Sequence, residues 1–236
     1  MNLFVIEGID CSGKQTVSKL LTERIKKDIS EKAINISFPD YTKPAGQCVR
    51  SYLNGEYIDD KNERLPILYS TLYAIDRGLF FRTKCDDGRS MAQTLNDDYR
   101  FVISDRYTTS NFIHQGARLV EKVHSEYEVT QLLREYVYKM EDIEHNLYSV
   151  PRARHTFVLN PDIKIIIDRI SKRNDNKHGA GTDIHEQNNN HLRNAYAAIQ
   201  HFKEYNILRN TSFIECGTLS PEEITDIIFK SIAQGI

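Results

Sequence analysis

Short apolar runs alternate along the chain with longer stretches in which apolar side chains recur every three or four residues. Apolar runs that end at polar or turn-forming positions are typical of buried strands. The predicted strands are 3–6, 33–38, 100–104, 156–159 and 212–215. The longer stretches have the period of amphipathic helices. The predicted helices are about 17–27, 48–53, 63–84, 91–96, 109–116, 126–145, one starting at 160–162, 184–205 and 221–233.

The order of these elements predicts the fold class. Short strands that alternate with helices form a parallel sheet covered on both faces, so we expect an α/β fold in one domain spanning residues 1–236. A polar, glycine-containing stretch at 174–184 has no hydrophobic period and predicts a mobile loop, within a lid at about 170–186. In the helix predicted at 63–84, one face is expected to pack on the core; it carries Leu65, Leu68, Leu72, Ile75 and Leu79.

Polar segments follow three of the predicted strands. They are the loop that starts at Glu7, the segment 38–41 and the segment 105–107. Ligands of parallel sheets bind outside the carboxyl ends of the strands. We therefore expect these three segments to converge at one edge of the sheet.

The loop after the first strand has the spacing of a phosphate-binding loop, Gly-x-x-x-x-Gly-Lys, in Gly8, Gly13 and Lys14. Glycines allow the backbone N–H groups to turn toward a phosphate, and the helix that follows directs its positive end at the anion. A chance glycine pair is the alternative, but the strand before and the helix after favour the phosphate loop. We therefore predict a three-layer α/β/α fold of the P-loop NTPase type with five parallel strands, in which Lys14 reaches the outer phosphates of a nucleotide.

Two positions are candidates for holding magnesium. Asp105 follows an apolar strand directly, where the second signature of phosphate-loop proteins places a magnesium-holding acid; a helix cap is the alternative. The residue after the loop lysine is normally Ser or Thr, whose hydroxyl binds the metal. Here it is Gln15, whose amide oxygen is a candidate ligand, and Thr16 comes one place later.

Arginines and one tyrosine are candidates for binding a nucleotide. Arginine grips phosphate with a planar fork, and Arg106 lies at the expected mouth of the sheet, whereas a solvated surface charge is the alternative for it and for Arg77. Tyr73 shares a helix face with Arg77 and would either stack on a base or pack in the core. Arg169 and Arg173, four residues apart beside the mobile loop, would either supply charge to a transition state or form a solvated helix end.

Composition narrows the possible partners and compartment. The formal net charge of −2 gives no general attraction to nucleic acid or to an anionic membrane. Four scattered cysteines without metal-site spacing favour a reducing compartment. No apolar run reaches membrane-spanning length and no signal peptide is recognisable, so we expect a soluble, cytoplasmic protein without a membrane or nucleic-acid partner.

Together these segments resemble the thymidylate kinases, P-loop nucleoside monophosphate kinases that phosphorylate dTMP. The resemblance rests on 6–10 with Gly13-Lys14, on Phe38-Pro39-Asp40-Tyr41, on Tyr73 with Asp76-Arg77, on Asp105-Arg106-Tyr107 with Ser110-Asn111, and on Asp183 and Glu186. It implies transfer of the γ-phosphoryl group of ATP to dTMP, giving dTDP and ADP for dTTP synthesis, with Mg²⁺ and in a homodimer.

The resemblance also implies roles for individual residues. ATP would be bound by Gly8, Ile9, Asp10, Cys11, Ser12, Gly13, Lys14, Gln15 and Thr16. The dTMP-binding residues would be Asp10, Phe38, Pro39, Tyr41, Tyr73, Arg77, Arg106, Ser110 and Asn111. Among them, Arg77 and Arg106 would hold either the dTMP phosphate or the edge of the thymine ring. The catalytic residues would be Lys14, Asp10, Arg106, Arg169 and Arg173, with Asp105 and Gln15 for the metal.

The chain departs from the family pattern at three places. Cys11 stands where one branch of the family has an arginine. The missing cation is therefore expected from the lid region, where Arg169, Lys172 and Arg173 are the candidates. His114 replaces a tyrosine that helps to exclude a ribose 2′-hydroxyl, and Gln15 replaces the metal-binding hydroxyl.

Two other functions remain open from the sequence. A deoxynucleoside kinase would need a carboxylate base, for which Glu7 is the candidate. The arginine pair argues against this alternative, because a nucleoside carries no phosphate. A nucleotide-binding regulator without turnover is permitted by Gln15 and Cys11.

Overall fold

The computed structural model describes residues 1–57, 65–120, 123, 125–176 and 189–235. The lid predicted at about 170–186 falls mainly on 177–188, which lie outside the described residues together with Asp183 and Glu186. The side chain of Arg173 is outside them as well.

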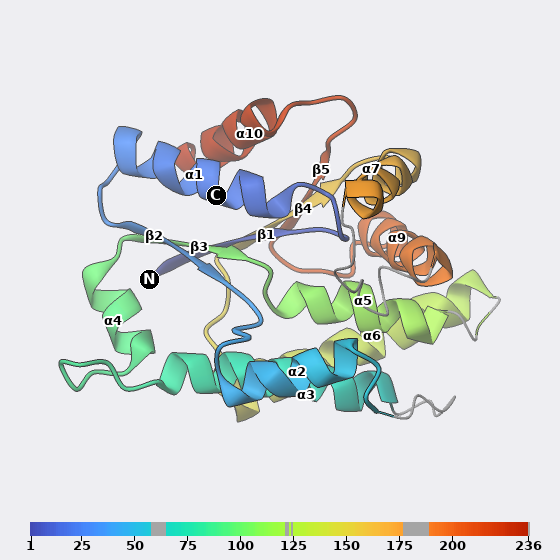
Figure 1. Cartoon of the computed structure of the whole chain (residues 1–236), viewed down its shortest axis with the longest axis horizontal. Helices are drawn as coiled ribbons and strands as arrows, with labels where there is room; N and C mark the ends of the chain where they lie inside the picture. Colours follow the sequence, from blue (N-terminus) through green and yellow to red (C-terminus); the bar gives the residue numbers. More distant parts are fainter. Residues whose placement is uncertain (58–64, 121–122, 124, 177–188, 236) are drawn as a thin grey trace.

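Five parallel strands form one sheet in the order β2-β3-β1-β4-β5 (Figure 1). This arrangement confirms the predicted α/β fold, because each parallel connection crosses over through helical structure. The strands are β1 (Asn2–Glu7), β2 (Ala33–Ser37), β3 (Phe101–Asp105), β4 (His155–Asn160) and β5 (Thr211–Glu215).

Helices cover both faces of the sheet (Figure 1). They are α1 (Lys14–Asp28), α2 (Pro44–Leu53), α3 (Leu65–Arg82), α4 (Met91–Asp98), α5 (Thr108–Val120), α6 (Glu126–Glu141), α7 (Ile163–Asn176), α9 (Asn189–Glu204) and α10 (Pro221–Ala233), and a π-helical turn, η1 (Asp142–Leu147), continues α6. None of the described helices is long and apolar enough to cross a membrane.

The central strand β1 shows how the layers are formed. Successive side chains of a strand point to opposite faces. Phe4 and Ile6 accordingly pack with residues of α1 and α10, whereas Leu3 and Val5 pack with residues of α3 and α4. With both faces covered by apolar side chains, the sheet is a rigid base for the loops at its edge.

The predicted core face of α3 is wrong for three of its residues, whereas Leu72 is half-buried and packs against the cluster that contains Tyr69. Leu68 and Leu79 are each 55% exposed and Ile75 is 38% exposed. The inward side instead carries apolar residues such as Tyr69 together with polar residues such as Arg77. The helix therefore buries polar groups that have partners inside the protein, and hydrophobic spacing alone pointed to the opposite face.

Candidate active site

The loop between β1 and α1 has the backbone of a phosphate cradle. Gly8 has φ +148°, and a Cβ there would lie 2.7 Å from Ser12 Oγ and 2.8 Å from the Leu159 carbonyl oxygen. Gly13 caps α1 with φ 94°. Cys11 also has a positive φ, 60°, which is uncommon for a residue with a side chain and typical of functional loops. The loop shape therefore depends on these positions.

Lys14 folds back over this loop. Its side chain is buried, and Nζ donates a hydrogen bond to the Ile9 carbonyl oxygen at 3.2 Å and lies 3.5 Å from Asp10 Oδ1. Burial and the charge of Arg106 lower the pKa of Lys14, while neighbouring carboxylates oppose this shift. The ammonium group is thus held at the loop, where it would meet a phosphate.

Arg106 connects the loop to the segment after β3. It has φ 67°, and its guanidinium forms an ion pair with Asp10 through Nη2. Its Nη1 lies 3.1 Å from His114 Nε2. Burial would raise the pKa of Asp10, but Arg106 and Lys14 more than offset this and hold that pKa well below its ordinary value. Asp10 is therefore a carboxylate at neutral pH, shared between both segments.

Asp105 fits the expected magnesium role. Its Oδ1 is buried and has no hydrogen-bond partner among the described residues. Burial raises the pKa of Asp105, whereas Lys14 and Arg106 oppose that rise. No cluster of three or more potential ligands occurs in the described part of the chain. One carboxylate is enough, because Mg²⁺ at nucleotide sites takes its other ligands from phosphates and water. The Gln15 side chain is exposed, and its metal role stays a prediction.

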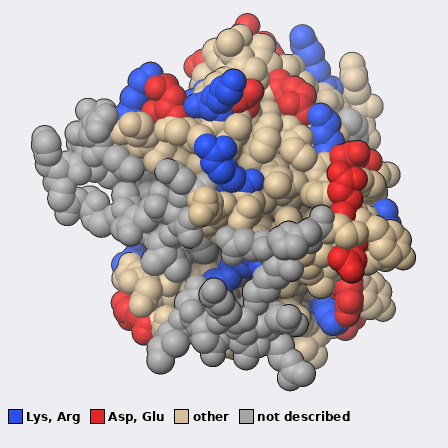
Figure 2. Space-filling model, turned by 90° about the vertical axis from the view of Figure 1, so that its right-hand side faces the viewer, with Lys and Arg blue, Asp and Glu red and all other residues tan. Residues whose placement is uncertain are grey.

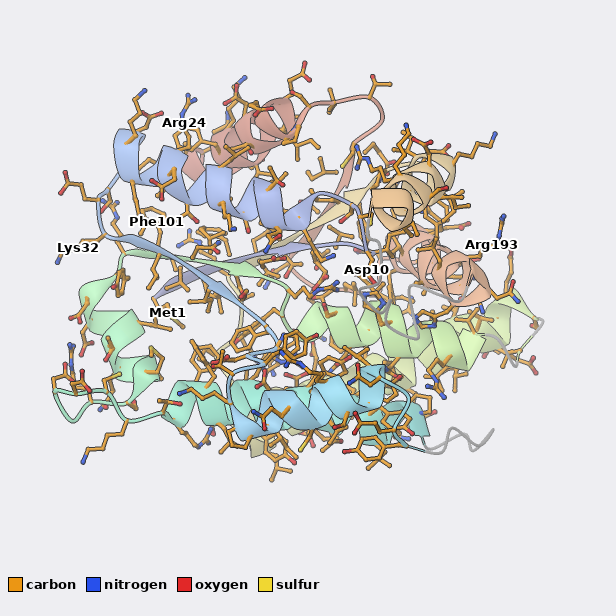
Figure 3. The ribbon with its side chains drawn as sticks, viewed as in Figure 1. Met1, Asp10, Arg24, Lys32, Phe101 and Arg193 are labelled. Carbon is orange, nitrogen blue, oxygen red and sulfur yellow. The ribbon has the colours of Figure 1, made fainter. Side chains whose placement is uncertain are left out.

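A pocket opens beside Asp10. All nine residues predicted to bind dTMP line it: Asp10, Phe38, Pro39, Tyr41, Tyr73, Arg77, Arg106, Ser110 and Asn111. Leu53, His114 and Gln115 complete the lining. Figure 3 shows Asp10 in the loop between β1 and α1, near α5. The structure thus brings the three predicted segments together at the carboxyl edge.

Aromatic packing and one glycine shape the pocket wall. Phe38, followed by a cis peptide to Pro39, has its ring 4.9 Å from that of Phe80. A Cβ on Gly46 would lie 2.0 Å from the Asp40 carbonyl oxygen, so only glycine lets α2 approach this segment so closely. Close packing therefore fixes the shape of this wall.

Tyr73 belongs to an aromatic group that joins α2 and α3. Tyr52 stacks on Tyr69 with ring centroids 4.0 Å apart, and Tyr73 meets the edge of Tyr52 at 6.5 Å. Tyr73 therefore packs within this aromatic group and also lines the pocket. Stacking on a base stays a prediction.

Arg77 is paired with a buried acid, and the part of a nucleotide that it binds stays a prediction. It is 1% exposed, and its Nη2 lies 2.6 Å from Oε1 of Glu144 on η1. Asn111 Nδ2 donates to the same carboxylate at 3.0 Å. Ser110 Oγ donates to Glu7 Oε2 at 2.8 Å. These side chains line the pocket while their internal contacts hold them in place.

A family model described as thymidylate kinase matches residues 6–226. The chain belongs to the thymidylate kinase family. The resemblance noted in the sequence is confirmed, and the family is one of kinases that use ATP as the phosphoryl donor.

Relatives of known sequence and structure agree with this assignment. The thymidylate kinase of Dictyostelium discoideum is 29% identical over 121 residues, which cover 50% of this chain and 48% of that protein. The thymidylate kinase of Mycobacterium tuberculosis (strain CDC 1551 / Oshkosh) is 31% identical over 120 residues, covering 50% and 51%. The match thus spans about half the length of each of these relatives. A solved thymidylate kinase structure from Candida albicans shares the fold, with a TM-score of 0.65 and 21% identity, covering 99% of this chain and 91% of that one.

Glu7 is placed as a structural acid within this thymidylate kinase fold. It is fully buried and accepts hydrogen bonds from the Gly8 and Tyr107 backbone amides at 3.0 and 3.3 Å, besides the Ser110 hydroxyl. Burial raises the pKa of Glu7, opposed by Arg106 and Lys14. A general base must reach the proton that it removes. Glu7 is engaged on both oxygens, and the deoxynucleoside kinase alternative is not favoured.

Arg169, one of the candidates for the missing cation, contacts the phosphate loop. It lies on α7 with an exposed side chain, and its Nη1 donates to the Cys11 carbonyl oxygen at 3.2 Å. Lys172 instead pairs with Asp168 at 2.7 Å. A cation thus stands beside the position where one branch of the family has an arginine.

Sequence reasoning missed two buried polar residues. Gln115 is 1% exposed, lines the pocket, and has its Oε1 without a hydrogen-bond partner among the described residues. Glu144 is fully buried behind the pocket. A signal for Glu144 existed: Leu133, Val137 and Met140 form the buried stripe of α6, and the next inward position is this acid.

Proposed function

We propose that the protein transfers the γ-phosphoryl group of ATP to dTMP, giving dTDP and ADP for dTTP synthesis. One observation carries this proposal: Asp10 belongs to the phosphate loop, yet its carboxylate is bound by Arg106 of the pocket. The phosphate loop and the pocket therefore share a residue. Such a junction suits transfer between two bound nucleotides, since positioning is the main task of phosphoryl transfer.

The donor side would be formed by the loop amides and by Lys14. Asp105, with its unpartnered buried oxygen, would hold Mg²⁺ directly or through water. When bound, the metal ion supplies positive charge to the phosphate oxygens. Lys14, Arg106 and Arg169 add cationic groups of the chain itself around the same point.

The acceptor side would be the pocket. Its lining combines apolar and aromatic side chains with a few polar groups, as the linings of small-molecule sites do. Arg106 would hold the dTMP phosphate, Tyr73 would contact thymine, and Asp10 would lie between the sugar 3′-hydroxyl and the reacting phosphates. Arg77, neutralised by Glu144, would face a neutral part of the nucleotide rather than the phosphate.

The reaction needs no general base. The second pKa of a phosphate monoester is about 6, so the attacking oxygen is already anionic at neutral pH. That oxygen forms a bond to the γ-phosphorus while the bond from the γ-phosphorus to the β,γ-bridging oxygen breaks, and ADP leaves with the electron pair. The residues of the chain align the two nucleotides and balance their charge.

The test is ADP release with ATP, Mg²⁺ and a panel of acceptors. We expect dTMP to be preferred over AMP, GMP and CMP, and thymidine not to be phosphorylated. Equal rates with all monophosphates would contradict the substrate. Phosphorylation of thymidine would indicate the deoxynucleoside kinase, and ATP binding without any turnover would indicate the regulator.

We also propose that the protein forms a homodimer in the cytoplasm. Leu68, Ile75 and Leu79 leave an exposed apolar face on α3, which a second copy would cover. All four cysteines are free thiols, as a reducing compartment favours. Light scattering after size exclusion should give twice the 27.4 kDa chain mass, and Leu79→Glu should shift the mass toward the monomer.

A further inference from the structure

A buried acid holds Arg77 at the back of the pocket. Glu144 Oε2 accepts from Arg77 Nε and Oε1 accepts from Nη2, both at 2.6 Å. Each side chain of the pair is 1% exposed. Two parallel hydrogen bonds between an arginine and a carboxylate fix the plane of the guanidinium as well as its position. Asn111 Nδ2 in turn holds Glu144 Oε1 at 3.0 Å.

The pairing with Glu144 uses only part of the hydrogen-bonding capacity of Arg77. A guanidinium has five N–H donors. Two bind Glu144, and Nη1 donates a third to the Tyr107 carbonyl oxygen at 3.3 Å. One N–H on Nη1 and one on Nη2 are left without a partner among the described residues. Since Arg77 lines the pocket, these are the groups through which it can bind a ligand there.

Charge decides what kind of group those donors suit. Burial alone would lower the pKa of Arg77, but Glu144 more than offsets this and raises it, so Arg77 stays protonated. The pair as a whole is neutral and dry. It therefore offers hydrogen-bond donors without net charge, which suits a carbonyl oxygen better than a phosphate.

We propose that Glu144 is a positioning residue for recognition of the nucleobase: it holds Arg77 so that its remaining N–H donors meet a ring carbonyl of a pyrimidine. A base with an amino group at that place would set donor against donor and be rejected. Thymine has a 4-carbonyl where cytosine has a 4-amino group. The inference rests on the proposed function for the identity of the acceptor, and on the family resemblance for the contact of Arg77 with the base. What it adds is Glu144 as the residue that holds Arg77 for that contact.

The test is calorimetric binding of dTMP, dCMP and a non-hydrolysable ATP analogue to Glu144→Gln. We expect dTMP binding to weaken about tenfold to a hundredfold, as expected when a buried hydrogen-bonding site is disordered, and dCMP binding to change much less. The preference for dTMP should fall accordingly. Binding of the ATP analogue should change less than about twofold, because the phosphate loop makes no contact with this pair.

A double-mutant cycle shows whether Glu144 acts through Arg77. In the Arg77→Met background, adding E144Q should leave the dTMP-to-dCMP ratio unchanged. The matched control is Glu141→Gln, three residues earlier, whose partner Arg152 lies 3.7 Å away on the surface. This control should bind both nucleotides as the wild type does.

The outcomes separate the two proposals. A melting temperature lowered by E144Q with an unchanged dTMP-to-dCMP ratio would make Glu144 purely structural and overturn the inference. If E144Q does not fold, Glu144→Asp, which withdraws the carboxylate by one methylene, decides in the same way: a reduced ratio supports the role and an unchanged ratio overturns it. A wild type that binds dTMP selectively but does not phosphorylate it would contradict the proposed function alone.

Discussion

The phosphate loop and the acceptor pocket are built by different means. The loop is a single run, residues 8–16, whose shape comes from Gly8 and Gly13 and from the strand and helix on either side. Apart from Asp10, the pocket takes its lining from separate segments between 38 and 115, with η1 behind them. Local backbone chemistry is enough for the first, whereas the second depends on contacts between residues far apart in the chain.

The two regions meet at the ion pair of Asp10 and Arg106, and each region has a strained residue there. Cys11 of the loop and Arg106 of the pocket both have positive φ values, 60° and 67°, and neither is glycine. Backbone strain of this kind persists only where the surrounding structure holds it. The meeting point is also the place where charge is concentrated, since Asp10, Lys14 and Arg106 lie together there. Figure 2 views the molecule from this edge of the sheet, with Lys and Arg side chains near the middle of the face.

The largest effect is expected from a change that disturbs only the phosphate loop, the donor side of the site. Lys14→Ala should lower kcat about 10²- to 10³-fold, because a buried cation aimed at developing charge is removed. Binding of dTMP should change only a few-fold. Steady-state kinetics with separate binding measurements test this, with the exposed Lys26→Ala as control. A near-normal rate would remove Lys14 from the mechanism.

The next largest effect is expected from a change that disturbs only the acceptor pocket. Gly46→Ala should destabilise the protein by about 3 kcal/mol, because the new methyl would meet the Asp40 carbonyl oxygen at 2.0 Å and force the backbone apart. Urea unfolding measures the loss. Binding of dTMP should weaken more than binding of an ATP analogue. Equal weakening of both would show that the two regions are not independent.

A smaller effect tests the junction and its pH dependence. Asp10→Asn should reduce the free energy of unfolding by about 2 kcal/mol at pH 7, since a charge-assisted hydrogen bond to Arg106 is lost. The pKa of Asp10 is lowered in the folded state, so its stabilisation is present above the unfolded pKa of about 3.9 and disappears only as pH falls through the lower folded value.

The difference in unfolding free energy between wild type and D10N should therefore stay constant from pH 7 to pH 5. It should shrink below about pH 4. Urea unfolding over this pH range provides the measurement. A difference that already shrinks between pH 7 and pH 5 would mean that Arg106 does not hold the Asp10 carboxylate as described.

The smallest expected effect is a change in stability on replacing Gly78, a glycine position with room for a side chain. Gly78 lies inside α3, and a Cβ there would make an ordinary contact of 3.5 Å with Tyr148 Cβ. Gly78→Ala should therefore stabilise the protein by about 0.5–1 kcal/mol through helix propensity. Thermal unfolding measures this gain. A clear loss of stability would show that α3 and η1 are packed more tightly than the contact indicates.

Much of the architecture was predictable from the sequence because it follows from short-range patterns. Apolar runs of strand length, separated by helical periods, predicted the parallel sheet, and the Ser220-Pro221 start of α10 was visible from its capping residues. The convergence of the loop, 38–41 and 105–107 followed from the rule that parallel strands present their carboxyl ends at one edge. The nine proposed dTMP-binding residues do share a pocket, although what they bind is not tested by their position.

The inward face of α3 and the state of Arg77 could not be predicted in the same way. Hydrophobic periodicity favoured the face with Leu68 and Leu79. It takes account of apolar side chains only, and not of the hydrogen-bonding partners that allow a polar side chain to be buried. Arg77 is buried only because Glu144, 67 residues later, neutralises it.

The sequence by itself thus determined the sheet, the phosphate loop and the family, since each is recognised from short stretches whose pattern is complete within the stretch. Only the tertiary structure decided that Arg77 is a neutralised donor rather than a free cation and that Glu7 is a bridge rather than a base. The physical reason is that the charge and accessibility of a buried group are set by the groups packed around it, and these come from distant parts of the chain.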